Sequence, residues 1–88
     1  MKQQLVHSET VGENLRILRK RSGLLQREVA AQLQVKEMEI TREIYAQIEA
    51  GIHNIDVDVL RALKQIYRAS WEEILDGPPE DEPAFGKK

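Results

Sequence analysis

The sequence predicts an all-α fold in which five short helices pack around a single core. Apolar residues recur at helical spacing in five segments, and capping residues or glycines stand at most of their ends. No segment shows the alternation of apolar and polar residues that is typical of a strand. The length of 88 residues fits one domain with one modest core.

The first helix is expected to begin at Thr10 and to end before Gly23. Thr10 and Glu13 have the spacing of a capping box, and Gly23 is a favourable stop because glycine adopts the left-handed conformation without steric cost. Residues 1–9 show no periodicity, so we expect a flexible N-terminal arm. The inward stripe of this helix is expected to be Val11, Leu15, Leu18 and Ser22.

The second helix is expected to run from Gln26 to Leu33 or Gln34. Its start signal is weak because Leu25 offers no side-chain acceptor to the first backbone amides. Leu24 and Leu25 are apolar connecting residues that can enter the core. The buried face of the helix is expected to be Val29, Ala30 and Leu33.

Residues 35–40 have two interpretations. The segment contains neither glycine nor proline, so it can extend the second helix by a turn. Alternatively, it forms a longer turn in which Val35, Met38 and Ile40 pack on the core. We favour the turn, which makes the third helix a separate element.

Residues 41–51 are predicted to form a capped helix with two different faces. Thr41 is a good N-cap residue, and Gly51 supplies a left-handed C-cap. One apolar stripe is formed by Ile44, Tyr45 and Ile48. The other side carries Arg42, Glu43, Ala46 and Gln47. A guanidinium, a carboxylate and an amide on one helical face suit a helix that lies in a DNA major groove.

Two more helices are expected towards the C-terminus. Asp56 is predicted to cap a helix that ends near Tyr67, and Ser70 and Glu73 form a second capping box that opens the last helix. The acidic, proline-bearing residues 78–88 are expected to be a disordered tail. The common core is expected to include Leu15, Leu18, Val29, Leu33, Tyr45, Ile48, Leu60, Leu63, Trp71 and Leu75.

Composition argues against several classes of protein. Cysteine is absent, which excludes disulfides and thiolate metal sites. No apolar run reaches the ~18–20 residues of a membrane span, and the N-terminus lacks an apolar signal segment, so we expect a cytoplasmic protein that does not enter membranes. No catalytic, phosphate-loop or metal-ligand motif occurs, so we expect no enzyme activity, metal or cofactor.

The charge distribution is uneven. The net charge of −2 counts against nucleic-acid binding, because domains with that function are often strongly basic. The excess of acid lies in residues 52–88, whereas residues 1–51 are close to balance. The densest basic cluster comprises Arg16, Arg19, Lys20, Arg21 and Arg27. By charge alone, a solvated helix face explains this cluster better than a binding surface.

Four segments carry a resemblance to a known family. They read V-G-E-N-L-R-I-L-R-K-R-S-G, L-L-Q-R-E-V-A-A-Q-L, I-T-R-E-I-Y-A-Q-I-E-A-G and V-L-R-A-L-K-Q-I-Y-R-A-S-W-E-E-I-L. In this order they resemble the helices of the Cro/phage-repressor (XRE-type) helix-turn-helix family. The resemblance implies a compact five-helix, lambda-repressor-like bundle over residues 10–77. The chain departs from the family at Leu25, where Ser or Thr is usual, and in the lengthened turn of residues 34–40, which is found in a bacterial subgroup.

The resemblance implies that the third helix reads bases. Arg42, Glu43 and Gln47 match the family's base-reading positions. Arginine can bond guanine O6 and N7, glutamine can bond adenine N6 and N7, and glutamate can accept from cytosine N4. The alternative is an ordinary solvated helix face, in which Glu43 pairs with Arg42 or complements the helix dipole.

Other family positions concern the phosphate backbone and the fold. Gln26 matches a phosphate-binding glutamine, although a plain surface amide is the alternative. Further phosphate candidates are Arg27, Lys36, Thr41 and Asn54. Arg19 and Glu49 match an ion pair that bridges the first and third helices in the family. An unpaired inward Glu49 would be costly, so we assign it a structural role.

These expectations combine into a sequence-specific double-stranded DNA-binding regulator of bacterial or phage type, and a repressor is favoured. Such a protein would read a pseudo-palindromic operator as a homodimer, in the cytoplasm at the nucleoid. Candidate dimer contacts are Trp71, Ile74 and Phe85. The alternative is a protein-interaction module on the same fold, such as an antitoxin-like or adaptor protein with weak or no DNA binding, which the acidic tail at residues 80–82 slightly favours.

Overall fold

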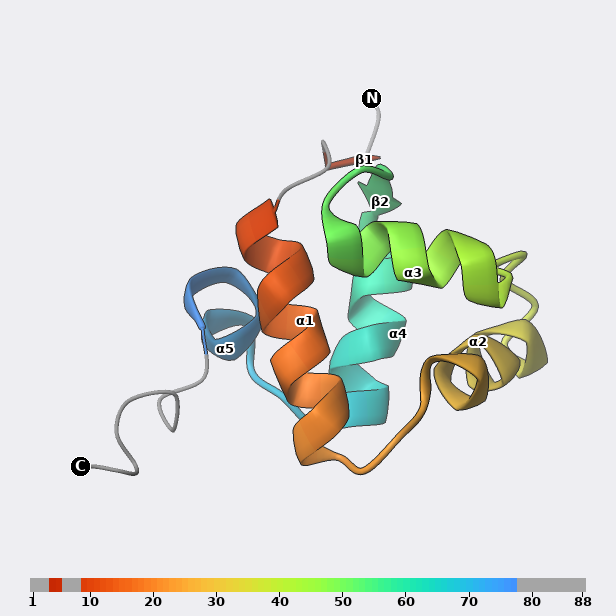
Figure 1. Cartoon of the computed structure of the whole chain (residues 1–88), viewed down its shortest axis with the longest axis horizontal. Helices are drawn as coiled ribbons and strands as arrows, with labels where there is room; N and C mark the ends of the chain where they lie inside the picture. The colour runs from red at the N-terminus through yellow and green to blue at the C-terminus, as the bar shows by residue number, and fades with distance from the viewer. Residues whose placement is uncertain (1–3, 6–8, 78–88) are drawn as a thin grey trace.

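The computed structural model describes residues 4–5 and 9–77, which confirm the predicted all-α fold. Within that part of the chain the helices are α1 (Glu9–Arg21), α2 (Gln26–Val35), α3 (Arg42–Ala50), α4 (Val57–Tyr67) and α5 (Trp71–Asp76) (Figure 1). The tail expected at residues 78–88 lies outside the described residues, as does most of the expected N-terminal arm.

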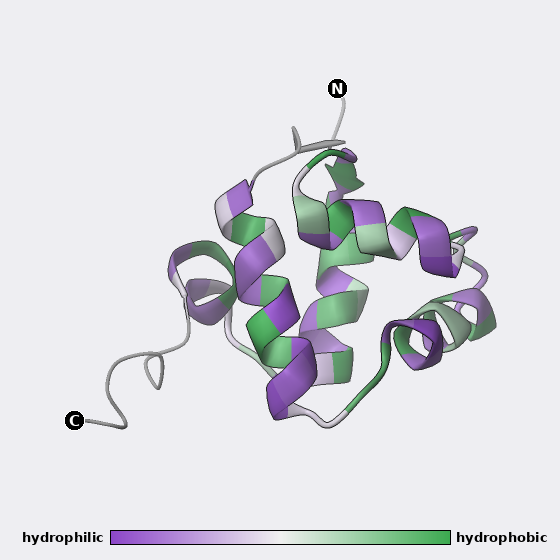
Figure 2. Ribbon diagram, in the orientation of Figure 1, coloured by the Kyte–Doolittle hydropathy of each residue, from purple (hydrophilic) through white to green (hydrophobic). Residues whose placement is uncertain are grey.

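Helix α1 lies at the centre of the arrangement. It packs against α3 on one side and α5 on the other, while α2 packs against both α3 and α4 (Figure 1). Hydrophobic and hydrophilic residues alternate along each helix, and the last turn of α1 is strongly hydrophilic (Figure 2). This amphipathic pattern lets each helix bury one stripe in a shared core.

A short antiparallel pairing was not anticipated from the sequence. Strand β1 (Gln4–Leu5) pairs with β2 (Ile55–Asp56), so that Gln4 lies opposite Asp56 and Leu5 opposite Ile55. Strands of two residues are too short to show a periodic pattern, which explains why sequence reasoning found none. At these two residues the chain is paired rather than free, in contrast to the expected arm.

Most of the predicted core is buried. Trp71 and Leu75 are the exceptions, with exposed fractions of 38% and 45%, so their assignment to the core was wrong. The short helix α5 contacts the core through Ile74, which is fully buried, and its other apolar side chains face outward. The remaining predicted members are buried, namely Leu15, Leu18, Val29, Leu33, Tyr45, Ile48, Leu60 and Leu63.

The predicted helix starts are only partly correct. Ser70 and Glu73 form the expected capping box, with hydrogen bonds of 3.0 and 3.1 Å between side chains and backbone amides. Helix α1 begins at Glu9, so Thr10 lies inside it, and Glu13 pairs with Arg16 instead of completing a capping box. Asp56 stands at the N-cap of α4 but makes no capping side-chain hydrogen bond.

Four of the described helices end in the same hydrogen-bond pattern. A residue with positive φ follows the last turn, and the next amide donates to a carbonyl five residues earlier, as in the Schellman motif. Gly23 and Gly51 fill the left-handed position after α1 and α3, as predicted. Glu37 and Arg68 fill it after α2 and α4, and no local sequence signal predicted this conformation for either residue.

The left-handed conformation of Glu37 ends α2 and decides between the two interpretations of residues 35–40. Helix α2 stops at Val35, and the chain then turns so that Met38 and Ile40 pack on the core. The turn interpretation is therefore correct. Val35 itself is 83% exposed, and Ser22 and Leu25 are exposed as well. The prediction that these three side chains face the core was therefore wrong.

Candidate nucleic-acid interface

Helix α3 presents the face that the sequence predicted. The Thr41 hydroxyl accepts a hydrogen bond of 3.1 Å from the Ile44 amide, and Gly51 ends the helix with a φ of 80°. Both caps fix the helix at the length the sequence indicated. Its inward residues Tyr45, Ile48 and Glu49 are buried, whereas Arg42, Glu43 and Gln47 are all exposed.

A buried ion pair fastens α3 to α1. Arg19 Nε lies 2.7 Å from Glu49 Oε2, and Arg19 Nη2 lies 3.2 Å from Glu49 Oε1, which is a bidentate geometry. Arg19 also donates to the Leu24 carbonyl at 3.0 Å. Hydrogen bonding to Glu49 raises the pKa of Arg19. The pair expected from the family pattern therefore has the geometry of a structural clamp on α3.

Gln26 belongs to this clamp. Its side-chain amide donates to Glu49 Oε1 at 3.0 Å, so the first residue of α2 is tied to α3 through the carboxylate that also binds Arg19. Three helices thus meet at Glu49. This bond fixes the Gln26 side chain, so Gln26 is not the plain surface amide of the alternative interpretation. A phosphate contact by Gln26 would have to form while this bond is kept.

A second buried contact joins α3 to α4. The hydroxyls of Tyr45 and Tyr67 hydrogen-bond to each other, and both residues are buried. Burial raises the pKa of Tyr45 and of Tyr67 well above the ordinary value, so both phenols stay neutral. Sequence reasoning placed Tyr45 in the core but had no signal for its bond to Tyr67.

Cationic side chains gather beside the exposed face of α3. A shallow hollow of about 400 Å³ lies where α1 ends and where α2 and α3 begin. Among the residues lining it, Arg42 was predicted to read bases, and Gln26 and Arg27 to contact phosphate. The full lining is Arg19, Lys20, Leu25, Gln26, Arg27 and Arg42.

The hollow adds Lys20 to the candidate residues. The sequence showed Lys20 only as one member of the basic cluster on the first helix, without a role of its own. Its position next to Arg27 and Arg42 depends on how α1 crosses the other two helices, which no local pattern encodes. The same cluster divides in the structure, because Arg16 pairs with Glu13 and Arg21 pairs with Glu73.

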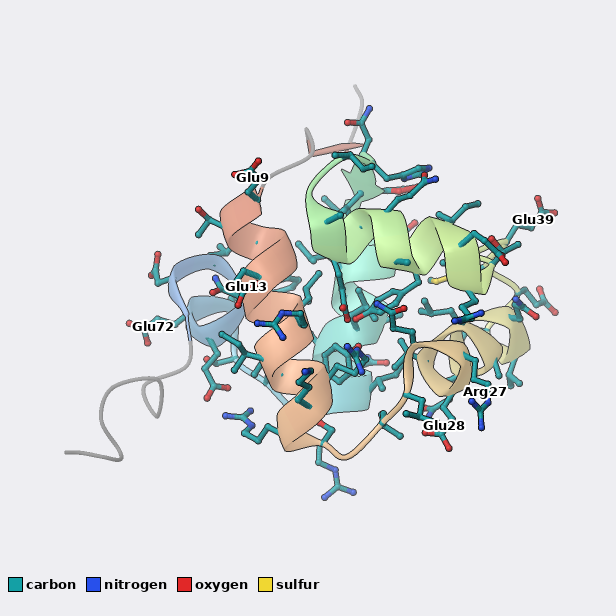
Figure 3. The ribbon with its side chains drawn as sticks, in the orientation of Figure 1. Glu9, Glu13, Arg27, Glu28, Glu39 and Glu72 are labelled. Atoms are coloured by element: carbon teal, nitrogen blue, oxygen red, sulfur yellow. The ribbon has the colours of Figure 1, made fainter. Side chains whose placement is uncertain are left out.

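The start of α2 lacks a capping hydroxyl but has a partial substitute. The Glu28 carboxylate accepts a hydrogen bond of 2.8 Å from the Leu25 amide, which satisfies one of the free donors at the helix start. Glu28 and Arg27 both project from this end of α2 (Figure 3). The acid that stabilises the helix therefore stands close to the cations of the hollow.

The other phosphate candidates lie outside the hollow. Lys36 is exposed at the end of α2, and Asn54 is exposed in the loop after α3, so the two flank opposite ends of α3. Thr41 is exposed and serves as the cap described above. The lengthened turn between α2 and α3 adds acid, since Glu37 and Glu39 line a second shallow hollow with Gln34, Met38 and Thr41.

Comparison with known families agrees with this architecture. A family model described as a helix-turn-helix domain matches residues 10–76. The chain therefore belongs to the helix-turn-helix domain family, and this membership indicates a DNA-binding regulator. No curated protein and no solved structure is significantly similar to the chain. In the part of the chain that the structure describes, no helix is long and apolar enough to cross a membrane.

Proposed function

We propose that the chain is a sequence-specific double-stranded DNA-binding repressor of the XRE/Cro type, which reads the major groove with α3. The observation that carries this proposal is the hollow lined by Lys20, Arg27 and Arg42 directly beside the exposed face of α3. Three cations at one edge of a groove-reading helix match the division found in DNA complexes, in which phosphate contacts set the position of side chains that read bases.

The side chains of α3 take different roles in this proposal. Gln47 and Glu43 point away from the core at the middle and start of α3, and they are the proposed base readers. Arg42 shares the hollow with two other cations, so it contacts phosphate as well as, or instead of, guanine. Gln26, Arg27, Lys36, Thr41 and Asn54 contribute further phosphate contacts around the helix.

The proposed operator is a pseudo-palindrome bound by a homodimer, with half-sites about 34–36 Å apart. Such a complex would occur in the cytoplasm at the nucleoid. Selection of bound sequences from a random DNA pool tests binding, specificity and half-site spacing together. Retention of no sequence at low salt would rule out the repressor function.

Gln47→Ala provides the test of base reading. A glutamine that bonds adenine in a bidentate manner discriminates by roughly 1–3 kcal/mol, so the variant should bind the selected site about 5- to 150-fold more weakly. Binding to random DNA should stay unchanged in a competition assay. Gln65→Ala, on the exposed side of α4, is the matched control and should change neither affinity. Equal weakening of both DNA classes by Gln47→Ala would make the residue a positioning contact.

The alternative is a protein-interaction module on the same fold. It is favoured by the acidic surface around the start of α3, where Glu37, Glu39 and Glu43 are all exposed. Salt dependence separates the two functions. A dimer that makes about eight phosphate contacts should lose about 10⁴-fold in affinity between 50 and 200 mM salt. An interaction module that does not bind DNA gives no such response.

A further inference from the structure

The hollow beside α3 holds positive charge that its surroundings do not neutralise. Lys20, Arg27 and Arg42 line it and are exposed, and within the described part of the chain none of them forms an ion pair. Glu28 is the acid of α2, but its carboxylate accepts a hydrogen bond from the Leu25 amide. Like charges gathered in one hollow repel each other, so an anion that enters it is favoured.

The last described residue of the chain lies near this hollow. Helix α5 packs against α1 (Figure 1), and a Cβ atom built on Gly77 would lie 3.4 Å from Asn14 Oδ1 on α1. Lys20 follows Asn14 by six residues on the same helix, a rise of about 9 Å. An extended chain spans at most about 3.3–3.6 Å per residue, so residues 80–82 can lie up to about 10–18 Å from Gly77. The hollow is therefore within their reach.

We propose that the hollow binds the acidic segment at residues 80–82 of the same chain. The segment reads Glu80-Asp81-Glu82, so its three carboxylates match the three cations in sign and number. Exposed ion pairs are individually weak, and a free acidic peptide would dissociate readily. A segment joined to α5 by two residues has an effective concentration in the millimolar range, which favours the contact within one chain over a contact between chains.

The contact gives the hollow two competing occupants. Where the hollow holds DNA phosphates, the acidic segment must first leave, so it lowers the affinity for selected and random DNA alike. This consequence rests on the proposed function, whereas the contact itself does not. Because both occupants are held by charge, salt weakens the internal contact as well as the binding of DNA.

Paramagnetic relaxation in the full chain without DNA tests the contact. The chain has no cysteine, so Ala84→Cys provides a single position for a nitroxide label, two residues after the acidic segment. A neutral-tail variant adds E80Q, D81N and E82Q. At about 10 mM salt the label should broaden the amide signals of the three cationic residues about twofold more in the charged chain than in the neutral-tail variant. At about 1 M salt, where the Debye length falls to about 3 Å, the difference should vanish.

Three results would overturn the proposal. They are equal broadening by the charged and the neutral tail, a difference that about 1 M salt leaves unchanged, and broadening that arises only when labelled and cysteine-free chains are mixed. The last result would mean that the acids bind a second copy. Lys20→Gln tests the contact from the side of the hollow and should reduce the broadening at Arg27 and Arg42. Circular dichroism establishes that each variant is folded.

DNA binding tests the consequence separately. The neutral-tail variant without the label should bind random DNA about tenfold more tightly than wild type, since three weak ion pairs no longer compete. The control E9Q, D58N and E72Q changes the net charge equally at exposed positions that do not line the hollow, and its gain should be much smaller. An equal gain would overturn the competition. If no variant binds DNA, the proposed function fails, while the relaxation result, obtained without DNA, still decides the contact.

Discussion

At the scale of single residues, Gly12 determines how closely α1 approaches α3. A Cβ atom built at this position would overlap the carbonyl oxygen of Glu49 and lie 2.7 Å from that of Ile48. The neighbours are backbone atoms of a packed helix, so they cannot rotate aside. Sequence reasoning assigned no role to Gly12, which lies between Thr10 and Glu13 of the expected capping box, and missed this contact.

Gly12→Ala should therefore destabilise the fold, although alanine is the better helix former by about 1 kcal/mol. Overpacking of this kind costs typically 1–3 kcal/mol, which we expect as the fall in the free energy of unfolding measured with urea. Gly23→Ala is the control, because open space surrounds a Cβ there and only the positive φ opposes the change. An unchanged or raised stability of Gly12→Ala would mean that the helices separate without cost.

At the scale of secondary-structure elements, the end of α2 contains a correctable strain. Glu37 has a φ of 67°, in the left-handed region that side chains with a Cβ adopt only at an energetic cost. Glu37→Gly should raise the free energy of unfolding by about 0.5–1 kcal/mol, because relief of that cost exceeds the added entropy of the unfolded chain.

Lys36→Gly is the matched control for this prediction. Lys36 has a φ of −84°, which any residue adopts, so glycine there only adds freedom to the unfolded chain and should lower stability. Thermal melts of the two variants should shift in opposite directions. If both variants lost stability, the conformation at Glu37 would carry little strain.

The helix ends also show what sequence can and cannot predict. The helix ends at Gly23 and Gly51 were predictable because glycine is the usual residue for positive φ. Glu37 and Arg68 adopt the same conformation because the following residues, Met38 and Ala69, are drawn towards the core. Local propensity does not encode this packing against the core. The sequence alone therefore left two interpretations for residues 35–40, at the end of α2.

The same limit applies to the candidate site. Helical periodicity predicted that Arg42, Glu43 and Gln47 face outward, because the stripe of Tyr45 and Ile48 must face inward. Periodicity describes one helix at a time. The gathering of Lys20 and Arg42 around one hollow depends on the crossing of separate helices, and the exposure of Trp71 depends on which side of α5 meets α1.

At the scale of the whole molecule, two sets of buried polar contacts connect α3 to α1, α2 and α4. Glu49 joins α3 to α1 and α2 through Arg19 and Gln26, and the hydroxyl pair joins it to α4. Buried polar groups are stable only when they are paired, so these bonds allow few alternative orientations of α3. The proposed DNA-reading face is therefore held in place by bonds on the buried side of α3, and of the residues that make them only Gln26 is also a proposed DNA contact.

This arrangement makes the stability of the whole fold sensitive to high pH. The pKa values of Tyr45 and Tyr67 are raised in the folded chain, whereas both lie near 10 when the chain unfolds. The folded state therefore keeps its protons to a higher pH. The resulting stabilisation is fully present below about pH 10 and is lost as pH rises further, by up to about 1.4 kcal/mol per pH unit for each tyrosine.

Urea unfolding between about pH 8 and 11.5 measures this slope. A double variant, Tyr45→Phe with Tyr67→Phe, removes both phenols together and should cost little at pH 7, because neither hydroxyl is left without its partner. The free energy of unfolding of this variant should fall less steeply above pH 10. The difference in slope should be as large as the combined contribution of the two tyrosines. All other ionisable groups are common to both proteins, so their contributions cancel in the comparison. Identical slopes would show that the two tyrosines ionise as readily in the folded chain as in the unfolded one, and that the contact between α3 and α4 admits water.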